Sequence, residues 1–145
     1  MKSLIIIFNF LAALQFVTAQ TPEMSSTNEG FNLTIQVTNI ESNQGEVYIG
    51  LYDSEGNWLK ENMKGTVAEI KNLKCSTVLE NIPAGTYAIS IYHDQNSNKD
   101  LDTGWFGIPS EPYACSRGAK GRFGPPKWKD AVFEVKDNKT IEIKF

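Results

Sequence analysis

The chain has 145 residues, of which 41% are hydrophobic, and this length suits a single domain with an ordinary core. The formal net charge at pH 7 is −3 and the basic residues are scattered among acidic ones, which argues against a nucleic-acid-binding surface. With two cysteines and one histidine, the chain also lacks the ligand set of an ordinary zinc site.

The N-terminus has the pattern of a secretory signal peptide. Lys2 supplies a short positive region, an apolar run extends from Leu4 to Val17, and the small residues before and at Ala19 suit cleavage there. The run is shorter than the roughly twenty apolar residues that a spanning helix needs, and no later segment approaches that length. The sequence therefore predicts a signal peptide (1–19), export to the periplasm or the extracellular medium, and no membrane span after cleavage.

Short alternating segments make up most of the remaining chain. Residues 20–30 are polar and are expected to form a linker, and from Phe31 onward apolar residues alternate with polar ones. The predicted strands cover residues 31–37, 46–52, 66–72, 76–82, 86–93, 131–135 and 141–145. Turn residues at 43–45 and 137–139 predict that the first two strands and the last two strands form β-hairpins. About seven strands without a convincing helix predict an all-β chain, with a single antiparallel β-sandwich over residues 31–145.

A polar segment follows the second predicted strand. Residues 53–65 carry Trp58, Leu59 and Met63 among charged and amide side chains. We expect Trp58 to fold back as a lid on the core, because a lone tryptophan in a polar loop is more often packed than functional.

A longer segment, residues 102–130, breaks the alternation. It holds five glycines, four prolines and five aromatic residues, and so long a segment without strands is usually functional or disordered. The aromatic content argues against disorder. We favour an arrangement in which the aromatic side chains fold inward and cap the end of the sandwich. In the alternative, some stay exposed and form a platform for a carbohydrate or a peptide along residues 103–129. The ligand-binding candidates are then Trp105, Phe106, Arg122, Phe123 and Trp128.

The strand over residues 86–93 leads into a run of side chains that end in oxygen at every second position. They are Asp94, Asn96, Asn98, Asp100 and Asp102. Calcium takes six to eight oxygen ligands from a flexible loop, and three neighbouring carboxylates repel one another unless a cation offsets them. The sequence therefore predicts a calcium site at these five residues, although Lys99 and Trp105 replace the glycine and the glutamate of an EF-hand. The alternative is a loop of Asx turns whose side chains cap their own backbone.

Catalysis is not expected from this sequence. His93 continues the inward face of its strand and is therefore interpreted as a buried scaffold residue, and no elbow motif supports Ser116 as its nucleophile. A glycosidase pair made of Asp94 and Asp102 is conceivable, but the same residues are better explained as cation ligands.

The two cysteines leave two alternatives open. An oxidising compartment permits a disulfide between Cys75 and Cys115, and two isolated thiols are equally consistent with the sequence.

Three blocks of the sequence resemble a known family. They are the strand PAGTY at Pro83–Tyr87, the loop YHDQNSNKDLDTGWFGIPSEP at 92–112, and the segment RFGPPKWKDAVF at 122–133. In this order they closely resemble the bacterial "domain of unknown function" family numbered twenty-one forty-one. The resemblance implies an exported, prealbumin-type or immunoglobulin-like sandwich and brings no established activity. Cys75 and Cys115 match no motif of that family, so the resemblance gives a disulfide no support.

Together these inferences predict an exported, calcium-stabilised β-sandwich that acts as a binding or accessory module of the cell envelope. A purely structural envelope protein without a ligand is one alternative, and exposure of the aromatic loop separates the two. A hydrolase that uses His93 and the nearby aspartates is another, and it requires a cleft that joins His93 to a nucleophile.

Overall fold

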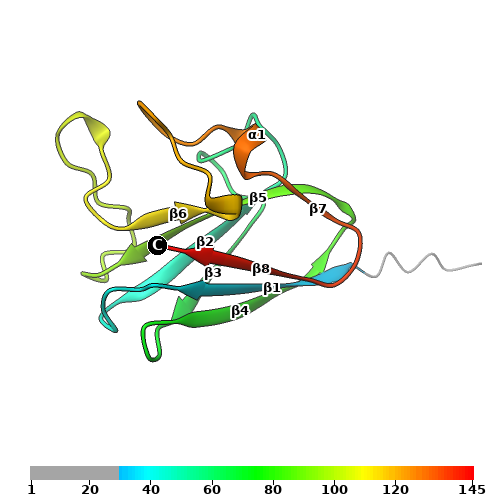
Figure 1. Cartoon of the computed structure of the whole chain (residues 1–145), viewed down its shortest axis with the longest axis horizontal. Coiled ribbons are helices and arrows are strands. Elements are labelled where there is room, and N and C mark those ends of the chain that lie inside the picture. Colours follow the sequence, from blue (N-terminus) through cyan, green and yellow to red (C-terminus); the bar gives the residue numbers. More distant parts are fainter. Residues whose placement is uncertain (1–29) are drawn as a thin grey trace, which may run out of the picture.

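The computed structural model describes residues 30–145, and Figure 1 shows them as two β-sheets that lie one on the other. The predicted signal peptide, and all of the predicted linker except Gly30, lie outside the described residues. Within residues 30–145, no helix has the length and apolar character that crossing a membrane requires.

The smaller sheet has three strands in the order β4-β1-β8. These strands are β1 (Phe31–Thr38), β4 (Cys75–Ile82) and β8 (Lys139–Lys144). β1 pairs antiparallel with β4 and parallel with β8. Leu33, Ile35 and Val37 of β1 are fully buried because alternate side chains of a strand point to the same face.

The larger sheet has the order β3-β2-β5-β6, and β7 also pairs with β5. Its strands are β2 (Glu46–Tyr52), β3 (Lys64–Glu69), β5 (Gly85–Asp94), β6 (Tyr113–Cys115) and β7 (Phe133–Val135). β5 pairs with β2 on one side, and on the other side with β7 near its start and β6 near its end. β5 is therefore the central strand of this sheet, and it delivers the chain into the loop that starts at Gln95.

The predicted all-β sandwich is confirmed, with eight strands instead of about seven. The additional strand is β6, which lies inside the segment expected to hold no strand. Both predicted hairpins are wrong: β1 and β2 lie in different sheets, and so do β7 and β8. The turns at 43–45 and 137–139 carry the chain from one sheet to the other. Alternation indicates which side chains face the core, but it contains no information about which strand lies alongside.

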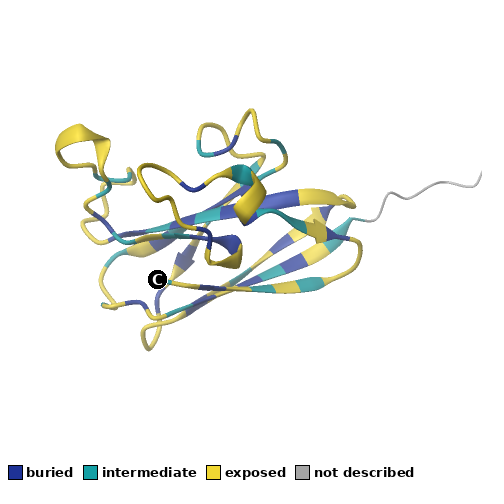
Figure 2. Ribbon diagram, turned by 45° about the horizontal axis from the view of Figure 1, so that its top comes forward, coloured by how far each residue is buried: buried dark blue, intermediate teal, exposed yellow. Residues whose placement is uncertain are grey.

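Two apolar clusters stabilise the fold. The first fills the space between the sheets and includes Ile35, Leu51 and Ile91, all of which are buried. The second lies on the outer face of β5, where Ala88 packs with residues of the segments that follow β2 and β6. Short helical segments cover this face: η2 (Ser116–Gly118) and α1 (Trp128–Ala131). The strands in Figure 2 are accordingly dark where they face a cluster, whereas the projecting loops are yellow.

Trp58 belongs to the second cluster. Its side chain is only 8% exposed, and its indole N–H donates a hydrogen bond of 2.8 Å to the carbonyl oxygen of Pro126. Its ring meets those of Tyr52 and Trp128 edge to face, at centroid distances of 5.0 and 5.8 Å. The prediction that Trp58 folds back as a lid is confirmed.

Cys75 and Cys115 do not form a disulfide. Both thiols are free and buried, but Cys75 packs between the sheets and Cys115 packs on the outer face of the larger sheet. Because these clusters lie on opposite faces, a bond between the two residues would require the backbone to move.

Candidate functional site

Asp94 ends β5 and anchors the loop that follows. The residue is fully buried, and its two carboxylate oxygens accept hydrogen bonds from the backbone N–H groups of Asn98 (3.2 Å) and Lys99 (2.8 Å). A buried carboxylate is tolerated only when such bonds replace its hydration. Asp94 therefore folds residues 95–99 back over the end of its own strand.

Asp102 closes the same loop from its other end. Its two carboxylate oxygens accept hydrogen bonds from the side-chain amides of Asn96 (2.6 Å) and Asn98 (2.9 Å). The amide oxygens of these asparagines in turn accept backbone N–H groups two residues ahead, at Asn98 (3.0 Å) and Asp100 (2.9 Å). These are Asx turns, in which side chains replace the backbone partners that a loop lacks.

Glu111 supports this loop from a later part of the chain, and sequence reasoning missed it. It is 8% exposed, and its two oxygens accept the backbone N–H groups of Gln95 (3.0 Å) and Asp102 (3.1 Å). One buried side chain therefore joins the first and the last residues of the segment 95–102, which we call the Asx loop. The available signal was the position of Glu111 between Ser110 and Pro112, within the block that carries the family resemblance.

The predicted calcium ligands meet in one loop, where they hydrogen-bond to one another and to the backbone, and Asp94 Oδ1 and Asn96 Oδ1 share the N–H of Asn98. The carboxylate oxygens of Asp94 and Asp102 and the amide oxygens of Asn96 and Asn98 all face N–H groups at hydrogen-bonding distance. Asp100 contributes its backbone N–H and is exposed. Within residues 30–145, no group of three or more His, Cys, Asp or Glu side chains is arranged to hold a metal ion. Calcium takes six to eight oxygen ligands, so binding it here would require these side chains to exchange part of their present hydrogen bonds for the ion.

The environment of the loop raises the pKa of a neighbouring tyrosine, Tyr92. Tyr92 stacks on Tyr48 with a centroid distance of 5.0 Å, and its hydroxyl donates to the carbonyl oxygen of Lys99 at 3.0 Å. Burial, together with Tyr48 and the carboxylates of Asp94, Asp100 and Glu111, raises the pKa of Tyr92 to about 12. Tyr92 therefore stays a neutral donor at physiological pH.

His93 is a scaffold residue, as its position in the sequence predicts. It is fully buried, and its Nε2–H donates a hydrogen bond of 2.7 Å to the carbonyl oxygen of Gln44. The 43–45 turn reaches it because Gly45 has a φ of +72°, and a Cβ there would lie 1.8 Å from the carbonyl oxygen of Asp94. This contact fixes the turn against the base of the Asx loop.

The hydrolase alternative receives no support from the geometry. Ser116 is fully buried, and its hydroxyl donates to the carbonyl oxygen of Ala131 (2.6 Å) and accepts the N–H of Ile89 (2.9 Å). Both partners are backbone groups, so Ser116 joins β5 to α1. His93 instead contacts the 43–45 turn, so its side chain and that of Ser116 are not brought together.

The first group of aromatic candidates stands at the tip of a projecting loop. Residues 103–110 include η1 (Trp105–Gly107), and at this tip Trp105 is 89% exposed, Phe106 97% and Ile108 65%. The loop is ordered at its base, where the N–H of Gly104 donates to the carbonyl oxygen of Ile108 at 2.7 Å and Ser110 to Asp102 at 2.8 Å. We call residues 103–110 the η1 loop.

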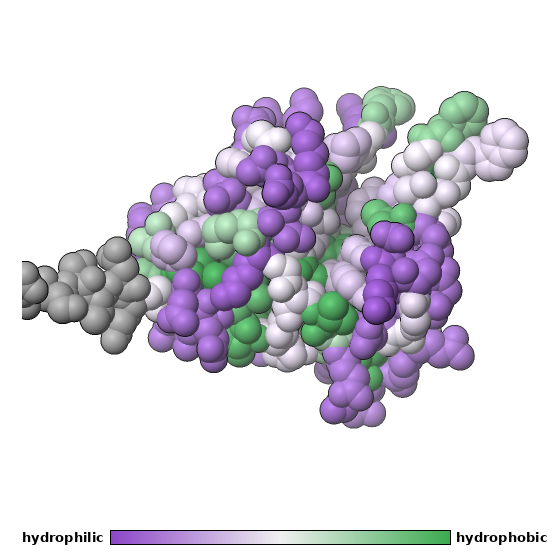
Figure 3. Space-filling model, turned by 180° about the vertical axis from the view of Figure 1, so that it is seen from behind, coloured by the Kyte–Doolittle hydropathy of each residue, from purple (hydrophilic) through white to green (hydrophobic). Residues whose placement is uncertain are grey.

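The second projecting segment, residues 120–126, is called the Phe123 loop here. Phe123 is 100% exposed, and Arg122 beside it is also exposed. A Cβ at Gly121 would lie 1.6 Å from the carbonyl oxygen of Gly124, so the glycine permits the narrow turn of this loop. Both loops project at the top of Figure 1, and in Figure 3 two lobes that end in hydrophobic atoms rise from the same side of the molecule.

The favoured arrangement of these aromatics is therefore wrong for three of them. Trp105, Phe106 and Phe123 point into solvent, and only Trp128 packs inward, against Trp58. The physical reason is that Trp58, η2 and α1 already cover the outer face of β5, so the remaining rings find no apolar surface beneath them.

Residues of the Asx loop, the η1 loop and the Phe123 loop all lie within a region that one family model matches. The model is described as "Uncharacterized protein conserved in bacteria (DUF2141)", and it matches residues 35–143. The chain belongs to the DUF2141 family. This confirms the family resemblance of the three sequence blocks. No curated protein and no solved structure matches the chain significantly.

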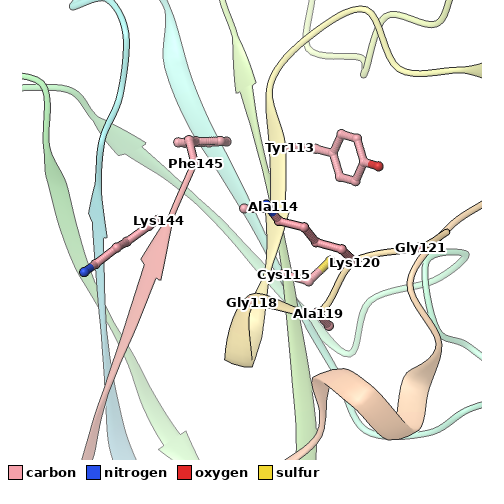
Figure 4. A pocket seen from close by; sticks show the side chains of 9 residues that line it. All are labelled: Tyr113, Ala114, Cys115, Gly118, Ala119, Lys120, Gly121, Lys144 and Phe145. Carbon is pink, nitrogen blue, oxygen red and sulfur yellow. The ribbon is translucent and has the colours of Figure 1, made fainter.

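A shallow cavity of about 290 Å³ lies in this DUF2141 chain between the edge of β6, the first residues of the Phe123 loop and the end of β8. Its lining residues are Tyr113, Ala114, Cys115, Gly118, Ala119, Lys120, Gly121, Lys144 and Phe145. In Figure 4 the Tyr113 ring and the Lys144 ammonium group point away from the gap between the two strands. None of Trp105, Phe106 and Phe123 lines this cavity.

Proposed function

We propose that this DUF2141 protein is an exported binding module of the bacterial cell envelope, and that it contacts its partner with the tips of the η1 loop and the Phe123 loop. The observation that carries the proposal is the almost complete exposure of Trp105, Phe106 and Phe123. Large apolar side chains on a soluble surface mark an interaction site when they gather on one part of it. The predicted signal peptide supports export.

The loops are also held in a way that suits binding. The η1 loop begins directly after Asp102, whose backbone is fixed by the buried carboxylate of Glu111. Asp94 fixes the start of the preceding loop in the same manner. A rigid base lowers the entropy that is lost when exposed loop residues engage a partner.

Calcium stabilisation of the Asx loop stays a separate hypothesis. Binding would require the side-chain oxygens to exchange their present hydrogen bonds for the ion, and the thermal melt described in the Discussion tests it. The proposed function does not depend on it, because the hydrogen bonds of Asp94, Asp102 and Glu111 already order the base of the η1 loop.

The test is sedimentation of the mature protein with total envelope fragments from bacterial cells. The loop variant is Trp105→Ser with Phe106→Ser and Phe123→Ser. We expect its apparent Kd to be at least tenfold weaker than that of the wild type, because each change removes an exposed ring without touching the core.

A matched control removes exposed apolar side chains elsewhere on the surface, through Val67→Thr, Leu73→Ser and Val78→Thr. Its apparent Kd should stay within twofold of the wild type. If the wild type does not sediment, or if the loop variant binds as well as the wild type, the proposed function is wrong and the purely structural alternative is favoured.

A further inference from the structure

We propose that the partner of the two loops is the surface of an anionic phospholipid bilayer, an inference that rests on the proposed function and names its ligand. In this arrangement Trp105, Phe106 and Phe123 enter the interfacial region, and basic side chains beside the Phe123 loop meet the lipid phosphates. Three independent features of the structure support this partner: local charge, the chemistry of the loop tips, and their shape.

The first feature is a basic segment, which is not apparent from the negative net charge of the whole chain. Residues 116–129 contain five basic residues and no acidic one, in a chain whose net charge is −3. The five are Arg117, Lys120, Arg122, Lys127 and Lys129, and all are exposed. Within residues 30–145 the ion pairs are Lys71–Glu69 and Lys136–Glu134, so none of the five is neutralised by a carboxylate. Such a segment attracts an anionic membrane surface.

The second feature is the composition of the η1 loop. Residues 103–110 carry no charged side chain, and their tip presents Trp105, Phe106 and Ile108. Tryptophan favours the membrane–water interface, where its ring meets lipid and its N–H meets water. The backbone at the tip is partly satisfied internally, because Gly104 donates to Ile108 and Gly107 donates to Gly104. Such internal bonds lower the cost of moving a loop out of water.

The third feature is that the two tips are convex and share one side of the molecule. Figures 1 and 3 show both loops projecting in the same direction, so a single surface can touch both. A carbohydrate or a peptide is normally held in a concave site whose walls bury most of the ligand. The cavity between β6 and β8 is lined by neither Trp105 nor Phe123. Projecting rings fit a deformable bilayer better than they fit a small, rigid ligand.

The experiment uses the mature protein and sedimentable vesicles, one set of phosphatidylcholine alone and one set with 30% phosphatidylglycerol. At 100 mM NaCl we expect binding to the anionic vesicles to be at least tenfold tighter, with a blue shift of tryptophan fluorescence as Trp105 leaves water. At 500 mM NaCl the preference for anionic vesicles should fall below threefold, because salt screens the basic segment.

Two variants separate the contributions of the rings and the charges. The loop variant defined above should lose at least tenfold in affinity for anionic vesicles. The charge variant, Lys120→Gln with Arg122→Gln and Lys127→Gln, should lose a similar factor on anionic vesicles and nothing on neutral ones. A control with the same change in net charge, Lys60→Gln with Lys74→Gln and Lys136→Gln, should stay within threefold of the wild type.

The outcomes distinguish this inference from the proposed function. If envelope fragments bind through the loops but vesicles made from their extracted lipids do not, the bilayer inference is wrong and the partner is a carbohydrate or a peptide of the envelope. Equal binding to neutral and anionic vesicles would also overturn it. If neither envelope binding nor vesicle binding depends on the η1 loop and the Phe123 loop, both proposals are wrong.

Discussion

Two loops of this chain carry a tryptophan beyond the end of a strand, and the two side chains end in opposite environments. Trp58 follows β2 and is 8% exposed, whereas Trp105 follows β5 and is 89% exposed. The surrounding residues do not explain the difference, because the segment around Trp58 is the more polar of the two.

The difference lies in what each loop can reach. The loop after β2 lies over the outer face of the larger sheet, where the carbonyl oxygen of Pro126 accepts the indole N–H and Trp128 supplies an apolar contact. The η1 loop starts from a base fixed by Glu111 and projects away from both sheets (Figure 1). A buried tryptophan and an exposed tryptophan are thus distinguished by the surface that each loop reaches and not by their neighbours in sequence.

The strongest test of this comparison applies one substitution to both tryptophans. Trp58→Ala should destabilise the fold by about 3–5 kcal/mol, because it opens a cavity and leaves the Pro126 carbonyl unpaired. Trp105→Ala should change the free energy of unfolding by less than about 0.5 kcal/mol, because the ring contacts solvent. Urea unfolding at equilibrium measures both.

If Trp58→Ala does not fold, Trp58→Phe keeps the contacts with Tyr52 and Trp128 and removes only the hydrogen bond and part of the ring. It should cost about 1–2 kcal/mol. Equal effects at Trp58 and Trp105 would contradict the assignment of the two residues to a core and to a surface.

The rigid base of the η1 loop is tested by Glu111→Gln. The side-chain NH₂ group cannot accept either of the two backbone N–H groups that Glu111 binds, so one of them loses its partner at a cost of about 1–3 kcal/mol. Hydrogen exchange should quicken at Gln95 and Asp102, while the strands exchange at rates that follow the change in global stability. The exposed Glu142→Gln serves as the control, and unchanged exchange at Gln95 would contradict the anchoring role.

Alkaline pH should weaken the two apolar clusters through their thiols. Burial raises the pKa of Cys75 and of Cys115 to about 11, and for Cys115 a hydrogen bond with Ser90 opposes this increase. Because the folded thiols resist ionisation, their stabilisation is complete below pH 9 and declines as the unfolded chain ionises between pH 9 and 11. We expect a loss on the order of 2 kcal/mol, measured by urea unfolding at each pH under argon.

The matched variant is Cys115→Ala, which should be less stable at pH 8 but lose less of its remaining stability as the pH rises. Thiol titration of the denatured, unreduced protein should find two reactive groups per chain. Finding none would show that Cys75 and Cys115 are bonded, contrary to the structure.

The smallest effect is expected from calcium. Because the carboxylate oxygens of Asp94 and Asp102 already accept hydrogen bonds, 10 mM CaCl₂ should raise the melting temperature by less than about 1 °C. A rise of several degrees that a chelator reverses, and that Asp94→Ala with Asp102→Ala abolishes, would establish the predicted calcium site instead.

The sequence predicts those elements that can be recognised from the pattern of their own side chains. The alternation that ends at His93 identifies β5 and its buried face, and the oxygen-rich run after it identifies the Asx loop. Strand partners are not encoded in this way, which is why both hairpins were predicted wrongly. β6 has three residues and pairs only with β5, so no periodicity reveals it.

The candidate site residues show the same difference between what the sequence reveals and what only the fold reveals. Glu111 becomes important only when residues 95 and 102 approach each other, a contact that depends on the folded loop. The direction of Trp105 and Phe123 depends on which surface is already covered when these loops close. The sequence therefore names these rings as candidates, whereas the exposure of each ring required the three-dimensional structure.

The parallel pairing of β1 with β8 has a consequence for how the chain folds during synthesis. The two strands join segments that are far apart, as the hydrogen bond between the Asn32 N–H and the Asn138 side chain across 106 positions illustrates. Until β8 has left the ribosome, β1 has only β4 beside it and one of its edges stays unpaired. Contacts of such long sequence separation form slowly, on a scale of roughly milliseconds to seconds. The smaller sheet therefore cannot be completed before β8 is available to pair with β1.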